Sequence, residues 1–107
     1  MIDSRTKFIA VSIYTVATKN LSAFETTARS TIERDTVVLN GFCEGIVMTN
    51  EEQTQVLIVT LWDSKQAWVS AEWEPRIGNA VATFTEAATA YDVRTFVPVT
   101  IVRSASG

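Results

Sequence analysis

Short runs of β-branched and aromatic residues alternate along this chain with segments whose apolar residues recur at helical spacing. Four such runs are bounded by turn residues and predict strands over residues 7–16, 42–49, 55–62 and 92–103. Helices are predicted over residues 22–38, over 64–73 and from Pro75 onward, the last on the stripe Ile77, Val81, Phe84 and Ala88. The order strand, helix, strand, strand, helix, strand is the ferredoxin-like pattern, an α+β fold with a four-stranded antiparallel sheet.

Local signals predict where each helix begins. Ser22 with Glu25 forms a capping box ahead of the first helix, and Asp63 with Gln66 forms another ahead of the second. Pro75 suits the first position of the third helix, because its missing N–H would have no partner there in any case.

Glycine and proline mark the irregular positions. Asn40-Gly41 predicts a turn, and Gly45 inside the second strand indicates a bulge or a close backbone approach. Pro98 lies inside the last predicted strand and indicates an edge or bulged element, because proline cannot donate to a sheet ladder.

The predicted sheet has no charged face along its first and third strands. Phe8, Ala10, Ser12 and Tyr14 share the face expected to meet the helices. The opposite face is also apolar, with Ile9, Val11, Ile13, Leu57, Val59 and Leu61. So large an apolar surface needs a cover, and we predict a homodimer in which two sheets face each other.

Three tryptophans gather at one strand-to-helix corner. Trp62 ends the third predicted strand, Trp68 lies in the following helix and Trp73 closes it. Large aromatics on both arms of a corner form a wall, either of the core or of a pocket. Core packing is the commoner role of such residues, and both interpretations stay open.

Composition limits the number of domains, the binding partners and the cellular compartment expected for the chain. Its 107 residues predict one domain over 1–107, with 47% hydrophobic and 20% charged residues. The net charge of −3 gives no support to binding of nucleic acid or of an acidic membrane. No stretch is apolar enough to span a bilayer and the N-terminus lacks a signal sequence, so we expect no membrane association. The single cysteine, Cys43, fits a reducing cytoplasm.

Missing residue types limit the chemistry. The chain has no histidine, so an ordinary zinc or copper site and the Ser-His-Asp and Cys-His mechanisms are not expected. It also has no glycine-rich phosphate loop. We therefore predict no metal, haem, flavin or other cofactor.

Over residues 7–102 the sequence resembles the antibiotic-biosynthesis-monooxygenase type of the dimeric α+β-barrel superfamily. The likeness lies in the strand FIAVSIYTV, the turn Gly41-Phe42 and the stretch VTLWDSKQAW. That stretch matches the recurrent pattern of the family at Trp62, Ser64, Ala67 and Trp68. The resemblance implies a homodimer, and oxidation of a small aromatic or polyketide-like phenol by O2 without a cofactor.

The resemblance also implies a site between the sheet and the helices. Trp62 matches the tryptophan implicated in catalysis in such enzymes, and Ala10 and Ser12 are small enough to leave space beside it. The expected substrate-binding residues are Ser12, Tyr14, Ile58, Trp68, Arg76 and Phe84. The alternative is that Phe24, Phe84 and Tyr91 fill this space, and that Arg76 is a solvated surface residue.

Two functions remain open. One is the cofactor-independent monooxygenase, and the other is a non-catalytic dimeric domain that binds a small molecule or accompanies an enzyme. Ile58 favours the second, because the enzymes carry an asparagine four residues before the tryptophan. Haem degradation is rejected because the histidine of its Asn-Trp-His set is absent, and RNA recognition because the third strand lacks that motif and the chain is acidic.

Overall fold

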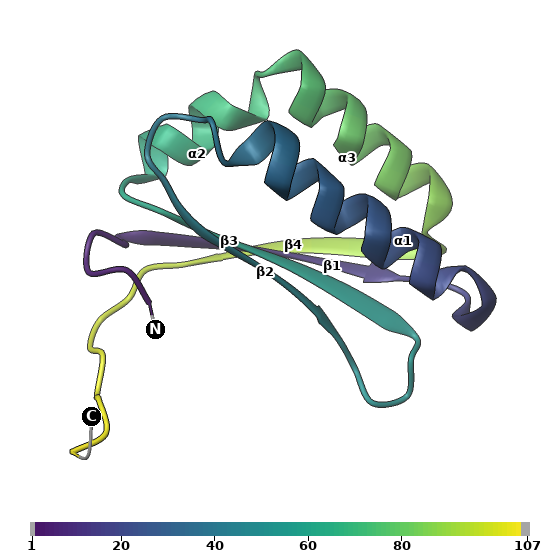
Figure 1. Cartoon of the computed structure of the whole chain (residues 1–107), viewed down its shortest axis with the longest axis horizontal. Coiled ribbons are helices and arrows are strands. Elements are labelled where there is room, and N and C mark those ends of the chain that lie inside the picture. Colours follow the sequence, from purple (N-terminus) through teal and green to yellow (C-terminus); the bar gives the residue numbers. More distant parts are fainter. Residues whose placement is uncertain (1, 106–107) are drawn as a thin grey trace.

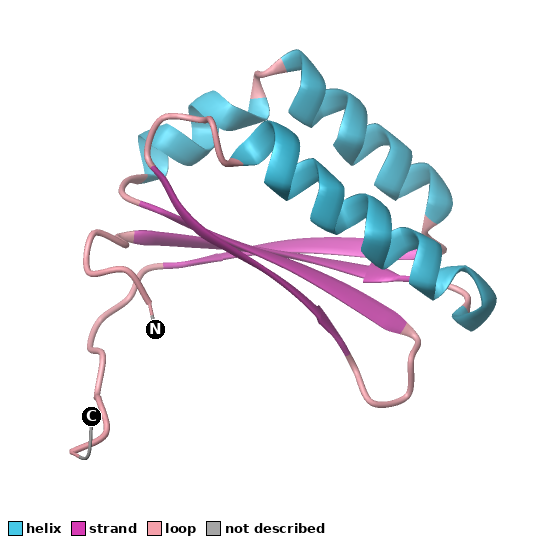
Figure 2. Ribbon diagram, viewed as in Figure 1, coloured by secondary structure: helices cyan, strands magenta, loops and turns pink. Residues whose placement is uncertain are grey.

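The computed structural model describes residues 2–105. Within that range a four-stranded antiparallel sheet, in the order β2-β3-β1-β4, carries the helices on one face (Figures 1 and 2). The elements follow one another as β1 (Phe8–Thr15), α1 (Thr18–Thr31), the π-helical turn η1 (Ile32–Thr36), β2 (Phe42–Thr49), β3 (Gln55–Trp62), α2 (Lys65–Glu72), α3 (Pro75–Ala87) and β4 (Ala90–Phe96). The α+β ferredoxin-like prediction is confirmed.

The hairpin strands β2 and β3 have the predicted bounds, and β1 is one residue shorter at each end. The last strand was predicted wrongly. β4 begins two residues earlier than expected and ends at Phe96, before Pro98. Residues 97–105 contain no further strand, and in Figure 1 this segment runs away from the sheet on the side opposite the helices. Proline offers no N–H for pairing, which is a sufficient reason for the ladder to stop there.

The first helix begins four residues before the predicted capping box, so that prediction is wrong. Ser22 lies inside α1, and the Glu25 carboxylate accepts a hydrogen bond from the Thr49 hydroxyl instead of returning to a cap. Leu21 is buried and extends the apolar stripe of Phe24 and Ala28 by one turn towards the N-terminus. Burial of that extra leucine stabilises a helix longer than the local cap signal indicated. At its other end η1 stops at Thr36, two residues short of the prediction.

The second helix uses a different cap from the predicted one. Ser64, not Asp63, precedes the first helical residue, and its hydroxyl accepts from the Ala67 amide at 3.0 Å. The start of α3 at Pro75 is confirmed. Its predicted stripe faces inward, with Phe84 buried and Ile77 half-buried.

The glycine signals identify a turn and a close approach. Gly41 has φ +82°, a conformation suited to glycine, in the predicted turn. A Cβ at Gly45 would lie 2.9 Å from Ile32 Cγ2, so the backbone there runs close under η1. The β-bulge falls between Phe42 and Glu44 rather than at Gly45.

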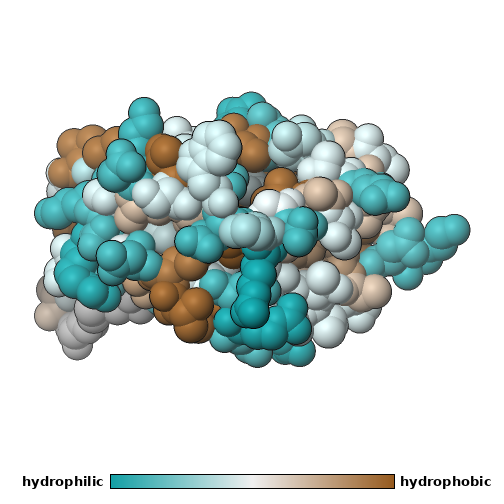
Figure 3. All heavy atoms as spheres, turned by 90° about the horizontal axis from the view of Figure 1, so that it is seen from above, coloured by the Kyte–Doolittle hydropathy of each residue, from teal (hydrophilic) through white to brown (hydrophobic). Residues whose placement is uncertain are grey.

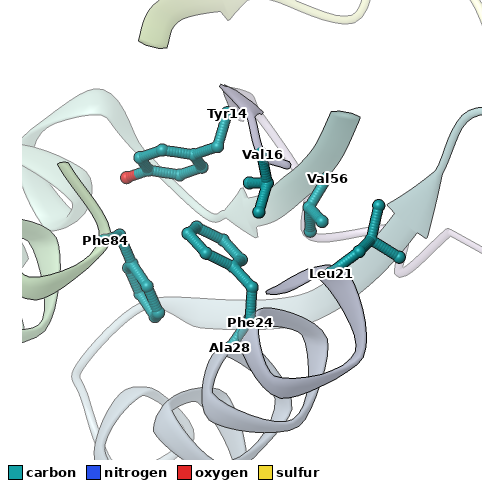
Figure 4. Packing of buried hydrophobic residues seen from close by; sticks show 7 residues of the cluster. All are labelled: Tyr14, Val16, Leu21, Phe24, Ala28, Val56 and Phe84. Carbon is teal, nitrogen blue, oxygen red and sulfur yellow. The ribbon is translucent and has the colours of Figure 1, made fainter. Parts of the chain in front are cut away.

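The core lies between the helices and the sheet. Its main cluster, shown in Figure 4, consists of Tyr14, Val16, Leu21, Phe24, Ala28, Val56 and Phe84. Seen over the helices, hydrophobic residues are scattered among hydrophilic ones (Figure 3). No helix within residues 2–105 is both long and apolar enough to cross a membrane.

The opposite face of the sheet is apolar, as predicted, but less exposed than expected. Ile9 pairs with Phe96 and lies on this face, where Phe96 is half-exposed. Ile46 and Met48 of β2 are also exposed there. Val59 is only 8% exposed and Leu61 only 1%, so the chain itself already covers part of the face.

Candidate functional site

A cavity of about 80 Å³ lies between the sheet and the helices. Its floor comes from alternate residues of the two central strands, because side chains on a strand point to one face at every second position. The floor residues are Ala10, Ser12, Tyr14, Ile58, Thr60 and Trp62. Its walls come from α1, η1, the loop after η1, α2 and α3, and are largely apolar.

Six of the seven side chains predicted for the site line this one cavity. They are Ser12, Tyr14, Ile58, Trp62, Trp68 and Phe84. The small side chains of Ala10 and Ser12 lie opposite the helices and leave the space open, as the sequence indicated. Their position is therefore that of a site, while the part each plays in binding or catalysis stays a prediction.

Trp62 is both a core residue and a cavity wall. It is 2% exposed and belongs to a buried cluster with Phe8 and Ala71. Its indole N–H donates to the Thr60 hydroxyl at 2.8 Å, and Phe42 meets its ring edge-on with centroids 5.4 Å apart. These contacts hold the indole in one orientation, so its cavity-facing side is a fixed surface.

The other two tryptophans differ sharply from each other. Trp68 is half-buried, lines the cavity and lies 5.3 Å from the ring of Phe8. Trp73 is 83% exposed and does not line the cavity. Of the tryptophan cluster seen in the sequence, only two members therefore belong to the site.

Tyr14 stands where the cavity meets the main aromatic core. Its ring lies 5.2 Å from Phe24, 5.7 Å from Phe84 and 5.8 Å from Tyr91, measured between centroids. These rings fill the space on one side of Tyr14, as the packing alternative proposed, and the cavity remains on the side towards Trp62. Burial raises the pKa of Tyr14 to about 12, and a hydrogen bond with Ser12 opposes that rise. The phenol is therefore neutral near pH 7 and able to donate a hydrogen bond.

Glu72 is a lining residue that the sequence did not single out. It ends α2 one turn after Trp68 and is exposed as a whole residue, while partial burial of its carboxyl raises the pKa and a hydrogen bond with Trp68 opposes the rise. Glu72 is the one charged side chain among the described lining residues. The available signal was its spacing of four from Trp68, which puts both on one helix face.

Arg76, the seventh predicted residue, lies outside the cavity. Its side chain is 80% exposed, and its guanidinium is 3.6 Å from a carboxylate oxygen of Asp35. Asp35 is buried and also lies 3.5 Å from Arg34. The arginine therefore connects the start of α3 to η1 on the outer surface, and the expected contact with a phenolate is not supported.

The sequence also missed the residues that cover the cavity. Ile32 and Thr36 of η1, and Leu39 in the following loop, line it from the side opposite the floor. π-Helical turns inside α-helices are frequent at functional sites, because they displace the following backbone from the regular helix path.

The arrangement suits a small apolar ligand with one or two polar groups. The lining side chains with hydroxyl or carboxyl groups are Ser12, Tyr14, Thr31, Thr36, Thr60 and Glu72, and most of the others are apolar. About 80 Å³ is well below the roughly 300–1,000 Å³ of ordinary ligand pockets. An aromatic ligand therefore has to displace part of the wall, in which Leu39 and Trp68 are half-buried. Within residues 2–105, no three side chains of the His, Cys, Asp and Glu types gather to hold a metal.

Several solved structures with this architecture are named as antibiotic biosynthesis monooxygenases. The chain superposes with a TM-score of 0.87 on a monooxygenase from the gene ActVA-Orf6 of Streptomyces coelicolor, solved with the ligand nanaomycin D, at 17% identity over 96% of each chain. A candidate antibiotic biosynthesis monooxygenase from Deinococcus radiodurans gives 0.79 at 13% identity, over 91% of this chain and 97% of the other.

Rv0793 from Mycobacterium tuberculosis likewise gives a TM-score of 0.79 at 14% identity, over 92% of this chain and all of the other. No model of a protein family and no curated protein sequence matches the chain. The fold is therefore that of the antibiotic-biosynthesis-monooxygenase type, as the sequence resemblance indicated, and the low identities leave substrate and activity to be argued from the site.

Proposed function

We propose that this chain is a cofactor-independent monooxygenase that oxidises a small aromatic or polyketide-like phenol with O2. The observation that carries the proposal is the cavity between Trp62 and Tyr14, which combines two indole faces with hydroxyl and carboxyl groups. Its setting in a fold shared with a monooxygenase crystallised with nanaomycin D supports the same class.

Such a reaction places limited demands on the protein. An electron-rich phenolate can pass an electron to O2 directly, so the substrate is its own reductant. The protein has to exclude water, orient the ring and stabilise the charge that moves from phenolate to oxygen. Apolar walls and the fixed face of Trp62 meet the first two demands, and the neutral Tyr14 hydroxyl is a donor suited to the third.

The proposal includes a homodimer formed through the open face of the sheet. Ile46, Met48 and Phe96 are exposed on that face, although each would gain roughly 1.5–3 kcal/mol from full burial. A second copy is the simplest cover, since a two-fold axis brings identical faces together.

The second candidate is a non-catalytic binding domain. Ile58 favours it, because this cavity-lining side chain has no polar atom to orient an oxygen adduct. The small cavity volume also favours it, because the walls have to move before a phenol can be held.

Fluorescence and oxygen uptake separate the two candidates. We expect 1-naphthol and 1,8-dihydroxyanthrone to quench tryptophan emission, and the quenching to persist in Trp73→Phe, which removes only the exposed indole. Uptake of oxygen above the enzyme-free rate supports the monooxygenase, whereas quenching without uptake supports the binding domain. If neither compound quenches, both proposals fail.

A further inference from the structure

We propose that Glu72 is the proton acceptor of this cavity and receives the hydrogen of a ligand's phenolic hydroxyl. The acceptor role in binding stands on the cavity itself, while its role in oxidation rests on the proposed monooxygenase function. It adds a named base to a site whose other hydroxyl-bearing side chains are uncharged near neutral pH, namely Ser12, Tyr14, Thr31, Thr36 and Thr60.

The position of Glu72 on α2 supports this role. The residue ends the helix that begins after the Ser64 cap, and it is one of the side chains that line the cavity. Trp68 lies one turn before it, lines the same cavity, and forms a hydrogen bond that opposes the rise in the pKa of the Glu72 carboxyl. A ring stacked on Trp68 would therefore bring its hydroxyl towards this carboxylate.

The surrounding charges favour the same assignment. Among the described residues lining the cavity from β1, β3, α1, η1 and α3, Tyr14 is the one other titratable group. Glu72 contributes to raising the pKa of Tyr14, so the two side chains interact electrostatically. Burial raises the pKa of Glu72 itself, which makes the carboxylate a stronger base. Tyr14 stays protonated and can donate, while Glu72 accepts.

The oxidation then balances without any further reactant. Glu72 takes the hydroxyl proton, leaving a phenolate, and the phenolate gives one electron to O2 to form superoxide and a phenoxyl radical. Coupling forms a C–O bond, and the peroxide takes the proton back from Glu72. Loss of the hydrogen on that carbon and cleavage of the O–O bond release water and leave a carbonyl, so one O2 converts the phenol to a quinone and one water.

A binding comparison tests the acceptor role without catalysis. Calorimetry under nitrogen measures the affinities of 1-naphthol and 1-methoxynaphthalene for the wild type, for Glu72→Gln and for the matched control Glu86→Gln, a residue of α3 that does not line the cavity. The ether keeps the rings and lacks the hydrogen. We expect the wild type and the control to prefer the phenol about ten-fold or more, as a hydrogen bond to a charged acceptor predicts, and Glu72→Gln to lose most of that preference.

The proposal is overturned if Glu72→Gln keeps the preference, if the wild type shows none, or if 1-naphthol does not bind. The pH dependence of oxygen uptake with 1,8-dihydroxyanthrone tests the oxidation separately. We expect the wild-type rate of oxygen uptake to fall at low pH, where Glu72 is protonated. In Glu72→Gln we expect a lower maximum rate and no such fall at low pH. A lost preference with no oxygen uptake in any variant would refute the monooxygenase and leave Glu72 as the acceptor of a binding site.

Discussion

Replacement of Trp62 tests whether one side chain is both core and cavity wall. Its ring is 2% exposed, packs against Phe42 and donates to Thr60 at 2.8 Å. Trp62→Ala removes all of these contacts, and buried tryptophans truncated to alanine cost about 3–5 kcal/mol. Trp62→Phe keeps much of the ring volume but loses the N–H, and we expect about 1–3 kcal/mol.

Urea unfolding followed by circular dichroism measures both costs, provided the slope with denaturant is unchanged. Thr60→Val is the matched control, because it leaves the indole N–H without its acceptor while the ring remains. The double variant Trp62→Phe/Thr60→Val should cost roughly 1 kcal/mol less than the sum of the single changes, since both remove one hydrogen bond. Additive costs would contradict that bond.

The same variants separate core from site. Trp62→Phe should weaken 1-naphthol binding by a few-fold, the loss expected when an aromatic contact worth roughly 0.5–1.5 kcal/mol is impaired. Thr60→Val should change binding less, because the indole stays in place. If Trp62→Ala costs under about 1 kcal/mol, the described burial is wrong. If Trp62→Phe binds 1-naphthol as tightly as the wild type, Trp62 is core alone.

Three further predictions follow from the fold. Folding raises the pKa of Tyr14 from 10.0 to about 12, so the unfolded chain loses the phenolic proton at a lower pH than the folded chain. The free energy of unfolding, measured by urea titration, should therefore fall by about 2–3 kcal/mol between pH 10 and 12. Tyr14→Phe should remove that fall. Val59→Asp should disrupt the proposed dimer and lower stability by several kcal/mol, because it buries an unpaired charge, and light scattering that finds a monomeric wild type at micromolar concentration would refute the pairing. Gly45→Ala should lower the free energy of unfolding by about 1–3 kcal/mol, measured by thermal unfolding, because the new Cβ would press on Ile32 Cγ2. If Gly45→Ala lowers stability equally in the wild type and in an Ile32→Ala background, that contact is contradicted.

The architecture could be predicted because the two central strands are nearly unbroken runs of apolar and β-branched residues. Ser12 and Ile58 pair across β1 and β3, as their shared face in the sequence implied. The first helix start could not be predicted from its cap, because burial of Leu21 outweighs the local signal at Ser22. The second helix is capped by Ser64 and not by the neighbouring Asp63. Both residue types cap helices well, so the sequence alone does not show which of the two adjacent positions is the cap.

The site was predictable where it rests on strands and less so where it rests on helices. Strand alternation places Ser12, Tyr14 and Trp62 on the helix side without any knowledge of the helices. Glu72 ends α2 and Arg76 lies in the first turn of α3, so a short connection separates them. The course of the backbone through that connection decides which of the two side chains faces the cavity. The sequence offered Arg76 either as a ligand contact or as a solvated surface residue, and the structure places Arg76 on the surface and Glu72 in the cavity lining.

Oxidation of 1,8-dihydroxyanthrone under oxygen-18 gas tests the central claim most directly. The protein, freed of bound metal by chelation, is mixed with the anthrone, and the quinone is measured by absorbance and mass spectrometry beside an enzyme-free blank. We predict quinone formation well above the blank, one heavy oxygen per quinone and one O2 consumed for each. Quinone formation at the blank rate, or a new carbonyl whose oxygen comes from water, would contradict the proposed monooxygenase.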